Sequence, residues 1–400
     1  MKITTYTQAV AYLESFIRPA IFRSITPQEA EKLNPLLRMQ KLLELLGNPH
    51  KKFKSVQITG TSGKGSTSYL ISKILTSAGY KTGLTISPHI QKASERIQVN
   101  KKQIGDREFI KIIDRFPEIV EKMKRNGFEE PTYYEMLLSI AFVYFAEQKV
   151  DIAIVEVGIE GKYDATNLID APVVVVTNIG LDHTEILGDT VEKIANEAVF
   201  AIRKNSVVVT GEEKKEVLKI INDRCKDTDS KLLRIDKDFS FNINKGNSEG
   251  INFSFNLQDL RGPTSFFSMK NIGLSLIGDY QAKNAALAIT AVLNLKKFGF
   301  KVSEKNIRDA LVSAFFPGRF EIIKFIIQNS EFRIILDGAH NVDKMNAFLT
   351  SLEKYFPDEK KIFLIAFKKD KNVNEMVAMI QKYAEKIIFS KFSVVTDMSK

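Results

Sequence analysis

A glycine-rich loop carries the clearest chemical signal in the sequence. The loop follows an apolar stretch and precedes a helical pattern, and it consists of Gly60, Thr61, Ser62, Gly63, Lys64, Gly65 and Ser66. Glycines let backbone N–H groups close on phosphate oxygens, and the helix N-terminus adds a positive dipole. Lys64 would reach the β- and γ-phosphates, and the hydroxyl of Ser66 would bind Mg²⁺. We therefore predict a site for ATP and Mg²⁺.

The spacing of this loop differs from the common P-loop pattern. That pattern would place a glycine at position 58, where Ile58 stands. The alternative is a glycine-rich turn between a strand and a helix that binds no ligand. We favour the phosphate site, because only phosphate explains a lysine between glycines at a helix start.

Three of the four histidines lie in short polar turns that follow or border apolar runs. These turns are Ser87-Pro88-His89, Leu181-Asp182-His183-Thr184 and Asp337-Gly338-Ala339-His340-Asn341. Binding sites in α/β proteins gather outside the carboxyl ends of strands, so these positions suit ligand binding. The alternative for each histidine is a structural role with satisfied hydrogen bonds. A Mg²⁺ site would use His183 as a neutral nitrogen ligand.

Glu156 ends an apolar run that begins at Asp151. A carboxylate in such a run is costly unless it meets a cation or accepts hydrogen bonds. We therefore favour a Mg²⁺ ligand over a solvated residue at the strand edge. Glu135 starts a helical pattern, and for this residue the simpler alternative is a favourable interaction with the helix dipole.

Short runs rich in Val and Ile recur between helical patterns and predict the elements that position these residues. Continuous apolar runs are typical of parallel strands covered on both faces, so we predict an α/β fold. Helices are predicted over 66–78 and 281–298, each ending before a glycine. Alternating segments between 232 and 276 predict a small antiparallel hairpin. The predicted parallel strands cover residues 56–59, 151–157, 173–177, 207–210, 333–336 and 362–365.

The length and composition fit a globular protein of two domains. We place the boundary at the turn Phe316-Pro317-Gly318-Arg319, which gives domains 1–315 and 316–400. No uncharged run approaches the roughly 20 residues of a membrane helix, so we expect no membrane association. Cys225 is the only cysteine, which excludes disulfides within the chain and cysteine-rich zinc sites. The N-terminus lacks the features of a signal peptide, and we expect a cytoplasmic monomer.

The net charge of +10 is compatible with anionic ligands. Lysines are spread along the chain without a basic tail or a patch interleaved with aromatic residues. This distribution disfavours a nucleic-acid partner and suits small anionic substrates such as ATP and a polycarboxylate.

Taken in order, the motifs resemble the folylpolyglutamate synthase and dihydrofolate synthase family of the Mur-ligase superfamily. The form Gly-Thr-x-Gly-Lys-Gly-Ser is similar to the Mur-ligase loop, and Ser-Pro-His together with Asp-Gly-Ala-His-Asn separates this family from the peptidoglycan ligases. The resemblance covers nearly the whole chain. It rests on Leu45 to Pro49, Gly60 to Ser66, Ser87 to His89, Glu95 to Ile97, Thr132 to Glu135, Glu156 to Gly158, Asp164 to Asn167, Thr177 to His183, Gly278 to Gln281, Asn284-Ala285, Pro317 to Glu321, and Asp337 to Asn341.

The resemblance implies a P-loop parallel-sheet ATPase domain, also carrying the folate site, followed by a smaller Rossmann-like domain, with ATP in the cleft between them. It implies an enzyme that adds L-glutamate to tetrahydrofolate or dihydropteroate through an acyl phosphate, at the expense of ATP. The alternatives are a catalytically weakened relative that binds nucleotide or folate, and a Mur-type ligase for another acidic substrate. By the same resemblance, the Mg²⁺ ligands are Ser87, Glu156 and His183, the adenine contact is Asn284, the phosphate contact is Arg319, and the residues facing nucleotide and amino acid are Asp337 and His340.

Three features depart from the family pattern. Where the family has Gly-Gly-Arg-Leu-Asp, this chain has Glu160-Gly161-Lys162-Tyr163-Asp164. Ala198 stands where the family has a carbamylated lysine that acts as an anionic Mg²⁺ ligand, so the resemblance implies a weakened metal site and an altered activity. Family members also continue through further strands after the last motif, and we expect the second domain to be cut short at Lys400.

Overall fold

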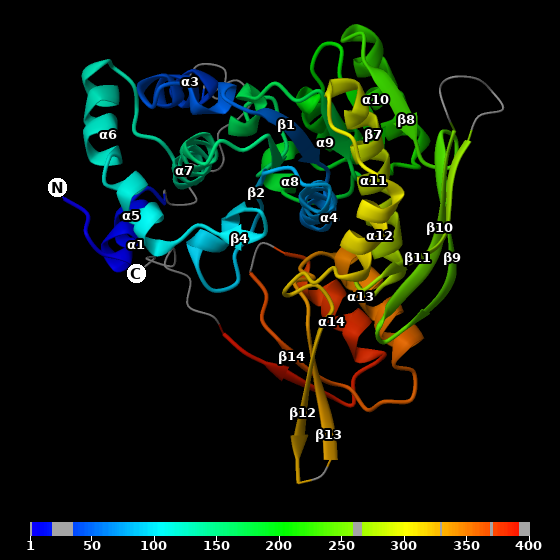
Figure 1. Cartoon of the computed structure of the whole chain (residues 1–400). Helices are drawn as coiled ribbons and strands as arrows, with labels where there is room; N and C mark the ends of the chain where they lie inside the picture. The colour runs from blue at the N-terminus through cyan, green and yellow to red at the C-terminus, as the bar shows by residue number, and fades with distance from the viewer. Residues whose placement is uncertain (1, 18–34, 259–265, 329, 369–370, 392–400) are drawn as a thin grey trace. The chain divides into compact units, whose positions relative to one another are not determined.

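The computed structural model describes residues 2–17, 35–258, 266–328, 330–368 and 371–391 (Figure 1). The chain divides into two compact units, one of Met1–Phe239 with Leu287–Ala310 and one of Ser240–Ala286 with Leu311–Lys400. These units group residues 240–286 with the second part of the chain. The boundary between residues 315 and 316 remains our proposal for the domain boundary.

An eight-stranded sheet organises the first unit, in the order β4-β3-β2-β5-β1-β6-β7-β8. The strands from β2 to β8 in this order pair in parallel, whereas β3 and β4 run antiparallel at one edge. The strands are β1 (Lys54–Thr59), β2 (Thr82–Thr85), β3 (Ile97–Val99), β4 (Lys102–Gln103), β5 (Ile152–Glu156), β6 (Val173–Val176), β7 (Val207–Thr210) and β8 (Lys231–Arg234).

Helices cover both faces of this sheet. Ala153 and Val155 of β5 belong to the core that contains α7, whereas Ile152 and Ile154 are buried outside it. Successive strand residues point to opposite faces, so the second pair faces α4, which contacts β1, β2 and β5. The helices on the α7 side are α1 (Tyr6–Glu14), α3 (Pro35–Leu45), α5 (Asp106–Ile113), α6 (Phe116–Arg125), α7 (Tyr133–Glu147), α9 (Val191–Ala198) and α10 (Lys215–Asp227). Helix α4 (Lys64–Ser77) lies on the other side.

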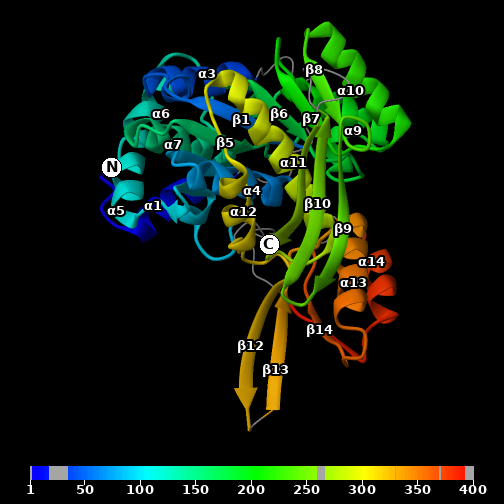
Figure 2. The ribbon, with the colours of Figure 1, turned by 45° about the vertical axis from the view of Figure 1, so that its right-hand side comes forward.

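The second unit contains three small sheets and a helix pair. Helices α13 (Val342–Tyr355) and α14 (Val373–Gln381) pack together (Figure 2), and their core includes Phe320, Leu349 and Ile380. Helices α11 (Asp279–Asn294) and α12 (Glu304–Val312) each run from one unit into the other. The strands are β9 (Phe239–Asn247), β10 (Gly250–Gln258) and β11 (Phe266–Leu274), the antiparallel pair β12 (Glu321–Ile327) and β13 (Ser330–Leu336), and the parallel pair β14 (Ile362–Ile365) and β15 (Lys386–Phe389).

The structure confirms the α/β fold and the first four predicted strands, and the antiparallel hairpin predicted in 232–276 is part of a three-stranded sheet in the order β11-β10-β9. Helix α4 ends before Gly79, and α11 continues as a 3-10 turn to Phe298, before Gly299. Two predictions are wrong in part. Residues 333–336 pair antiparallel rather than parallel, and residues 362–365 are not covered on both faces, since Leu364 is 71% exposed. An apolar run predicts a strand but not its partner or its cover.

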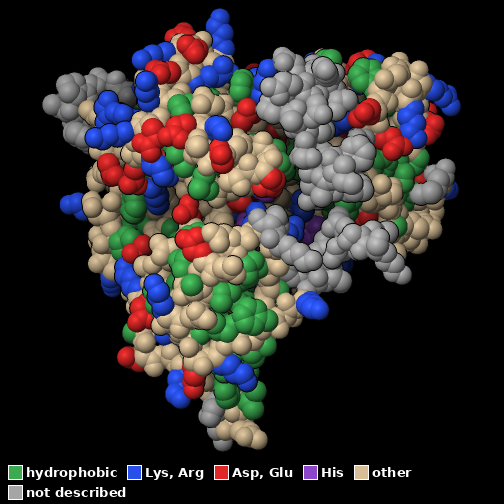
Figure 3. Space-filling model, turned by 180° about the vertical axis from the view of Figure 1, so that it is seen from behind, with side chains coloured by type: hydrophobic (Ala, Val, Ile, Leu, Met, Phe, Trp, Pro, Cys, Tyr) green, Lys and Arg blue, Asp and Glu red, His purple; other side chains and the backbone are tan. Residues whose placement is uncertain are grey.

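The hairpin β12–β13 carries several exposed hydrophobic side chains. It forms the narrow end at the bottom of Figure 3, where hydrophobic groups are visible, and Ile326 is 75% exposed. Elsewhere on the face shown in Figure 3, Lys and Arg are mixed with Asp and Glu. Among the described residues, no helix combines the length and the apolar character needed to cross a membrane.

Candidate active site

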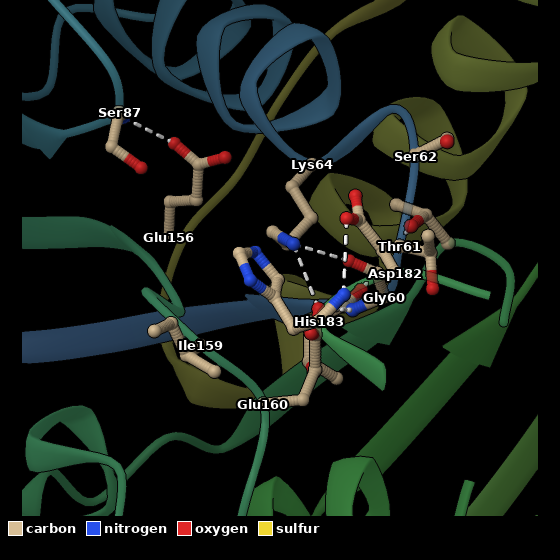
Figure 4. Close-up of polar contacts among 12 residues, drawn as sticks. Gly60, Thr61, Ser62, Lys64, Ser87, Glu156, Ile159, Glu160, Asp182 and His183 are labelled. Carbon is tan, nitrogen blue, oxygen red and sulfur yellow. Dashed lines mark hydrogen bonds and ion pairs between the residues drawn. The ribbon is translucent and has the colours of Figure 1, made fainter. Parts of the chain in front are cut away.

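Four neighbouring parallel strands deliver predicted site residues to one edge of the sheet. In the order β2, β5, β1 and β6, their carboxyl ends lead to Ser87, Glu156, the loop Gly60 to Ser66, and His183. Carboxyl ends of parallel strands meet at the same edge, which is where ligands bind in open α/β sheets. The structure therefore brings together the predicted residues of the first unit, as Figure 4 shows.

The start of the phosphate loop is fixed by residues that follow β6. Thr61 N donates to Asn178 O at 2.8 Å, and Ser62 N donates to Asn178 Oδ1 at 3.0 Å. Gly60 has a φ of +121°, and a Cβ there would lie 2.2 Å from Thr177 Oγ1 and 2.7 Å from Asn178 O. Only glycine fits this position, which explains the first glycine of the motif.

The loop then turns into helix α4 with an arrangement that suits an anion. Gly63 caps the helix with a φ of 83° and provides no side-chain hydrogen bond. The first N–H groups of a helix have no carbonyl partner within the helix and point towards its N-terminal end. Ser62 Oγ is shielded from solvent and has no hydrogen-bond partner among the described residues. These unpaired groups fit the oxygens of a phosphate.

Lys64 is held by an internal carboxylate. Its ammonium donates to Glu160 Oε1 at 2.7 Å and to the carbonyl oxygen of Gly60. Burial alone would lower the pKa of Lys64, but the attraction of Glu160, Glu156 and Asp182 outweighs it and raises this pKa. The lysine is therefore a cation in this site, as contact with phosphate requires.

Glu156 and Ser87 point towards each other at the ends of β5 and β2 (Figure 4). Ser87 N donates to Glu156 Oε2 at 2.6 Å, and Glu156 is only 6% exposed. Within the described ranges, no group of three or more His, Cys, Asp or Glu side chains would hold a metal ion by itself. The oxygens of Ser66, Ser87 and Glu156 fit a hard cation such as Mg²⁺, whose further ligands would be phosphate oxygens and water.

His183 lies in a tight turn that begins a short helix, α8 (Thr184–Leu187). Its φ is 50°, and its backbone N–H donates to Asp182 Oδ1 at 3.1 Å. The ring atom Nδ1 is 3.8 Å from Glu185 Oε1. The turn places His183 at the predicted edge, and its role as a metal ligand stays a prediction.

Three of the four predicted residues of the second unit, Arg319, Asp337 and His340, lie in or against the turn after β13. Asp337 Oδ2 accepts from Phe320 N and Oδ1 accepts from Ala339 N, both at 2.8 Å. Burial raises the pKa of Asp337, partly offset by these two bonds and by Arg319. Arg319 Nη1 donates to Gly318 O at 3.0 Å, and a Cβ at Gly338 would lie 2.5 Å from the same nitrogen.

His340 and Asn284 belong to two separate parts of the second unit. His340 Nδ1 is 2.8 Å from Gly338 O, and His340 Nε2 is 3.1 Å from Lys344 Nζ. On helix α11, Asn284 Nδ2 donates to Gln281 Oε1 at 3.0 Å, while the buried Gln281 Nε2 has no partner among the described residues. Gln281 is a donor that the sequence interpretation missed, although it stands in a motif already noted.

Three further residues of the site were missed or undervalued. Glu160, which contacts Lys64, was noted only as a departure from the family pattern. Asp164 accepts from Ile159 N and from Thr166 N, and burial raises its pKa to about 6. Tyr134 approaches Glu156 O at 3.4 Å. Glu160 was detectable as a carboxylate four residues after Glu156, but only the fold shows that it turns towards the loop.

The structure shows the surroundings of Glu135 and Ala198, which the sequence alone could not. Glu135 forms a capping box with Thr132 and pairs with the buried Arg38 at 3.0 Å, so its role is larger than an interaction with the helix dipole. Ala198 is buried at the end of α9. Its neighbour Glu197 accepts from Lys162 N at 2.9 Å, and this bond fixes the Glu197 carboxylate on the backbone of the segment that carries Glu160.

Comparison with known proteins agrees with this architecture. The family model described as the Mur ligase middle domain matches residues 58–292, and that of the dihydrofolate synthetase C-terminal domain matches 321–399. The dihydrofolate synthase/folylpolyglutamate synthase of Bacillus subtilis is 33% identical over 358 residues, covering 89% of this chain and 80% of that protein.

Solved structures give the same result. The folylpolyglutamate synthase of Thermotoga maritima has a TM-score of 0.81 at 31% identity, covering 98% of this chain and 85% of that one. A folylpolyglutamate synthase in complex with AMPPCP and folate has a TM-score of 0.84 at 30% identity, covering 96% and 89%. With this agreement in sequence and fold, the chain belongs to the folylpolyglutamate synthase/dihydrofolate synthase family of Mur-type ligases.

Proposed function

We propose that this chain is an ATP- and Mg²⁺-dependent ligase that joins L-glutamate to the carboxylate of a folate, with the loop Gly60 to Ser66 binding the phosphates of ATP. The observation that carries this proposal is the edge where that loop, Ser87 and Glu156 meet. The relative in complex with AMPPCP and folate supports both the nucleotide and the acceptor.

The chemistry requires an activated carboxylate, because a carboxylate does not accept an amine at neutral pH. The carboxylate oxygen attacks the γ-phosphorus of ATP, and the bond between this phosphorus and the oxygen that bridges to the β-phosphate breaks. The products of this step are ADP and an acyl phosphate. The glutamate nitrogen then attacks the acyl carbon, an amide forms, and phosphate and a proton depart. Two anions must approach each other in the first step, so positioning and charge neutralisation dominate catalysis.

The residues divide this work between them. Lys64 would neutralise charge on the β- and γ-phosphates, and the first turn of α4 would orient them. Mg²⁺, when held by Ser66, Ser87, Glu156 and His183, would add a Lewis acid to the transferring phosphate. In the second unit, we assign Arg319 to the phosphates, Asn284 to the adenine, and Asp337 and His340 to the nucleotide and the incoming amino acid.

The direct test is ADP release measured with the acceptor and glutamate supplied together and separately. The proposal expects release only when ATP, Mg²⁺, an acceptor and glutamate are all present. Mass spectrometry of a mixture of dihydropteroate, tetrahydrofolate and unrelated polycarboxylates would identify the acceptor and count the glutamates added. Products formed only from an unrelated polycarboxylate would support a Mur-type ligase for another acidic substrate instead.

One observation favours a second candidate, a relative that binds nucleotide or folate with weak catalysis. Ala198 cannot act as an anionic ligand, and the Glu197 carboxylate beside it is engaged by Lys162 N. The variant Ala198→Lys, assayed with bicarbonate, should increase glutamate-dependent ADP release if the lost lysine limits catalysis. Brisk turnover of the unchanged chain with no gain in the variant would remove this candidate. A monomeric state and a cytoplasmic location remain predictions.

A further inference from the structure

Glu160 lies on the segment after β5 and places a carboxylate against the loop Gly60 to Ser66, which we assign to an anionic ligand. It is 3% exposed and accepts from Lys64 Nζ at 2.7 Å and from Gly60 N at 3.2 Å (Figure 4). Lys64 Nζ also donates a hydrogen bond to the carbonyl oxygen of Gly60. The cation that the loop offers to a phosphate is thus already paired within the chain.

The surroundings of Lys64 carry more negative than positive charge. Glu160, Glu156 and Asp182 all act electrostatically on this single ammonium. A nucleotide without a metal would bring several further negative charges towards these carboxylates, at distances where like charges repel strongly in a poorly hydrated site. A nucleotide that arrives with a divalent cation brings compensating positive charge. Its phosphate can then replace Glu160 as the partner of Lys64.

We propose that Glu160 is a specificity-determining residue that makes this loop discriminate against nucleotide lacking a divalent cation. This inference rests on the proposed function of the loop as a nucleotide site. Glu160 competes with the phosphates for Lys64, and only the metal-bound nucleotide offsets the repulsion of the displaced carboxylate. A purely structural role of the Lys64–Glu160 pair would affect both forms of the nucleotide alike.

The variant Glu160→Gln tests this because the amide keeps the size and an acceptor for Gly60 N but removes the charge. Glu197→Gln is the matched control, since Glu197 lies next to the same segment and contacts the backbone N–H of Lys162 rather than Lys64. The probe is ADP, titrated calorimetrically in EDTA and in MgCl₂ at equal ionic strength. Thermal unfolding of each variant verifies that it is folded.

The expected result is that Glu160→Gln tightens metal-free ADP by at least about tenfold, the scale of one charge–charge interaction, and changes Mg²⁺–ADP much less. Glu197→Gln should leave the ratio of the two Kd values unchanged. An unchanged ratio in Glu160→Gln, with binding intact, would overturn this inference and leave the proposed function standing. Absence of ADP binding by the unaltered chain in both conditions would overturn the proposed function and this inference together.

Discussion

Two glycines, one in each unit, show how differently the predicted site residues of the two units are held. Gly60 follows β1 and Gly338 follows β13, and neither has room for a Cβ. At Gly60 the obstacle is the carbonyl oxygen of Asn178 and the buried Thr177 hydroxyl, whereas at Gly338 it is the end of the flexible Arg319 side chain. The phosphate loop is therefore enclosed by fixed backbone, whereas the turn after β13 lies against the flexible side chain of Arg319, which precedes β12.

Asp337 and Glu160, the carboxylates near these two glycines, differ in a similar way. Asp337 uses both oxygens to accept from the backbone N–H groups of Phe320 and Ala339, so it organises its own turn. Glu160 accepts from one backbone N–H and from the movable ammonium of Lys64. Changes at Asp337 should therefore affect folding first, and changes at Glu160 should affect ligand binding first.

The largest effect is expected from Lys64→Ala, which removes the cation of the phosphate loop. Turnover should fall at least about a hundredfold, the scale seen when a group that stabilises developing charge is removed. The change leaves Glu160 buried without its cation, which itself costs stability. The double variant Lys64→Ala with Glu160→Gln separates the two effects, because it removes both charges. Turnover close to that of the original chain in the double variant would contradict the assignment of the loop.

Gly60→Ala and Gly338→Ala test the comparison directly. Gly60→Ala combines a left-handed φ with a collision against backbone and should cost roughly 1–3 kcal/mol of unfolding free energy. Gly338→Ala displaces only the Arg319 side chain, so it should weaken activity with a smaller loss of stability. Urea denaturation of both variants measures the difference. Equal losses would mean that the two regions are equally rigid.

A smaller effect separates the metal site from the turn. Glu156→Gln and His183→Ala should each raise the Mg²⁺ concentration that gives half-maximal activity, since the first replaces an anionic ligand by a neutral amide oxygen and the second removes a ligand. Asp337→Asn should instead lower stability by about 1 kcal/mol, because one backbone N–H loses its acceptor. Activity titrated with MgCl₂ checks the first two variants, and urea denaturation checks Asp337→Asn. A magnesium dependence unchanged in the first two would refute the metal assignment.

The sequence predicted the helices and strands better than the contacts between distant residues. The Val-rich strands and the glycines after α4 and α11 are local signals, and the structure confirms the elements that they predicted. The partner of β13 and the exposure of β14 depend on distant chain segments, so periodicity could not reveal them. The pairing of Glu160 with Lys64 also joins residues 96 positions apart, and the motif that contains Lys64 gives no hint of it.

The smallest effect concerns Asp164, whose carboxyl accepts from Ile159 N at 3.1 Å and from Thr166 N at 2.8 Å. Burial raises its pKa from 3.8 to about 6, partly opposed by these hydrogen bonds and assisted by Glu160. Between these two pH values the folded chain binds a proton that the unfolded chain releases, so this residue makes the free energy of unfolding fall as pH rises. Above about pH 6 this contribution is constant.

Asp164→Asn removes that proton, so the stability of the original chain relative to the variant should decline from about pH 4 to pH 6 and then level off. Urea denaturation at a series of pH values from 4 to 7.5 measures this difference. The exposed Asp170→Asn, on the same segment, controls for general effects of charge. A difference that grows in favour of the original chain as pH rises would mean that Asp164 is stabilised as an anion. That outcome would contradict the effect of burial on the pKa of Asp164.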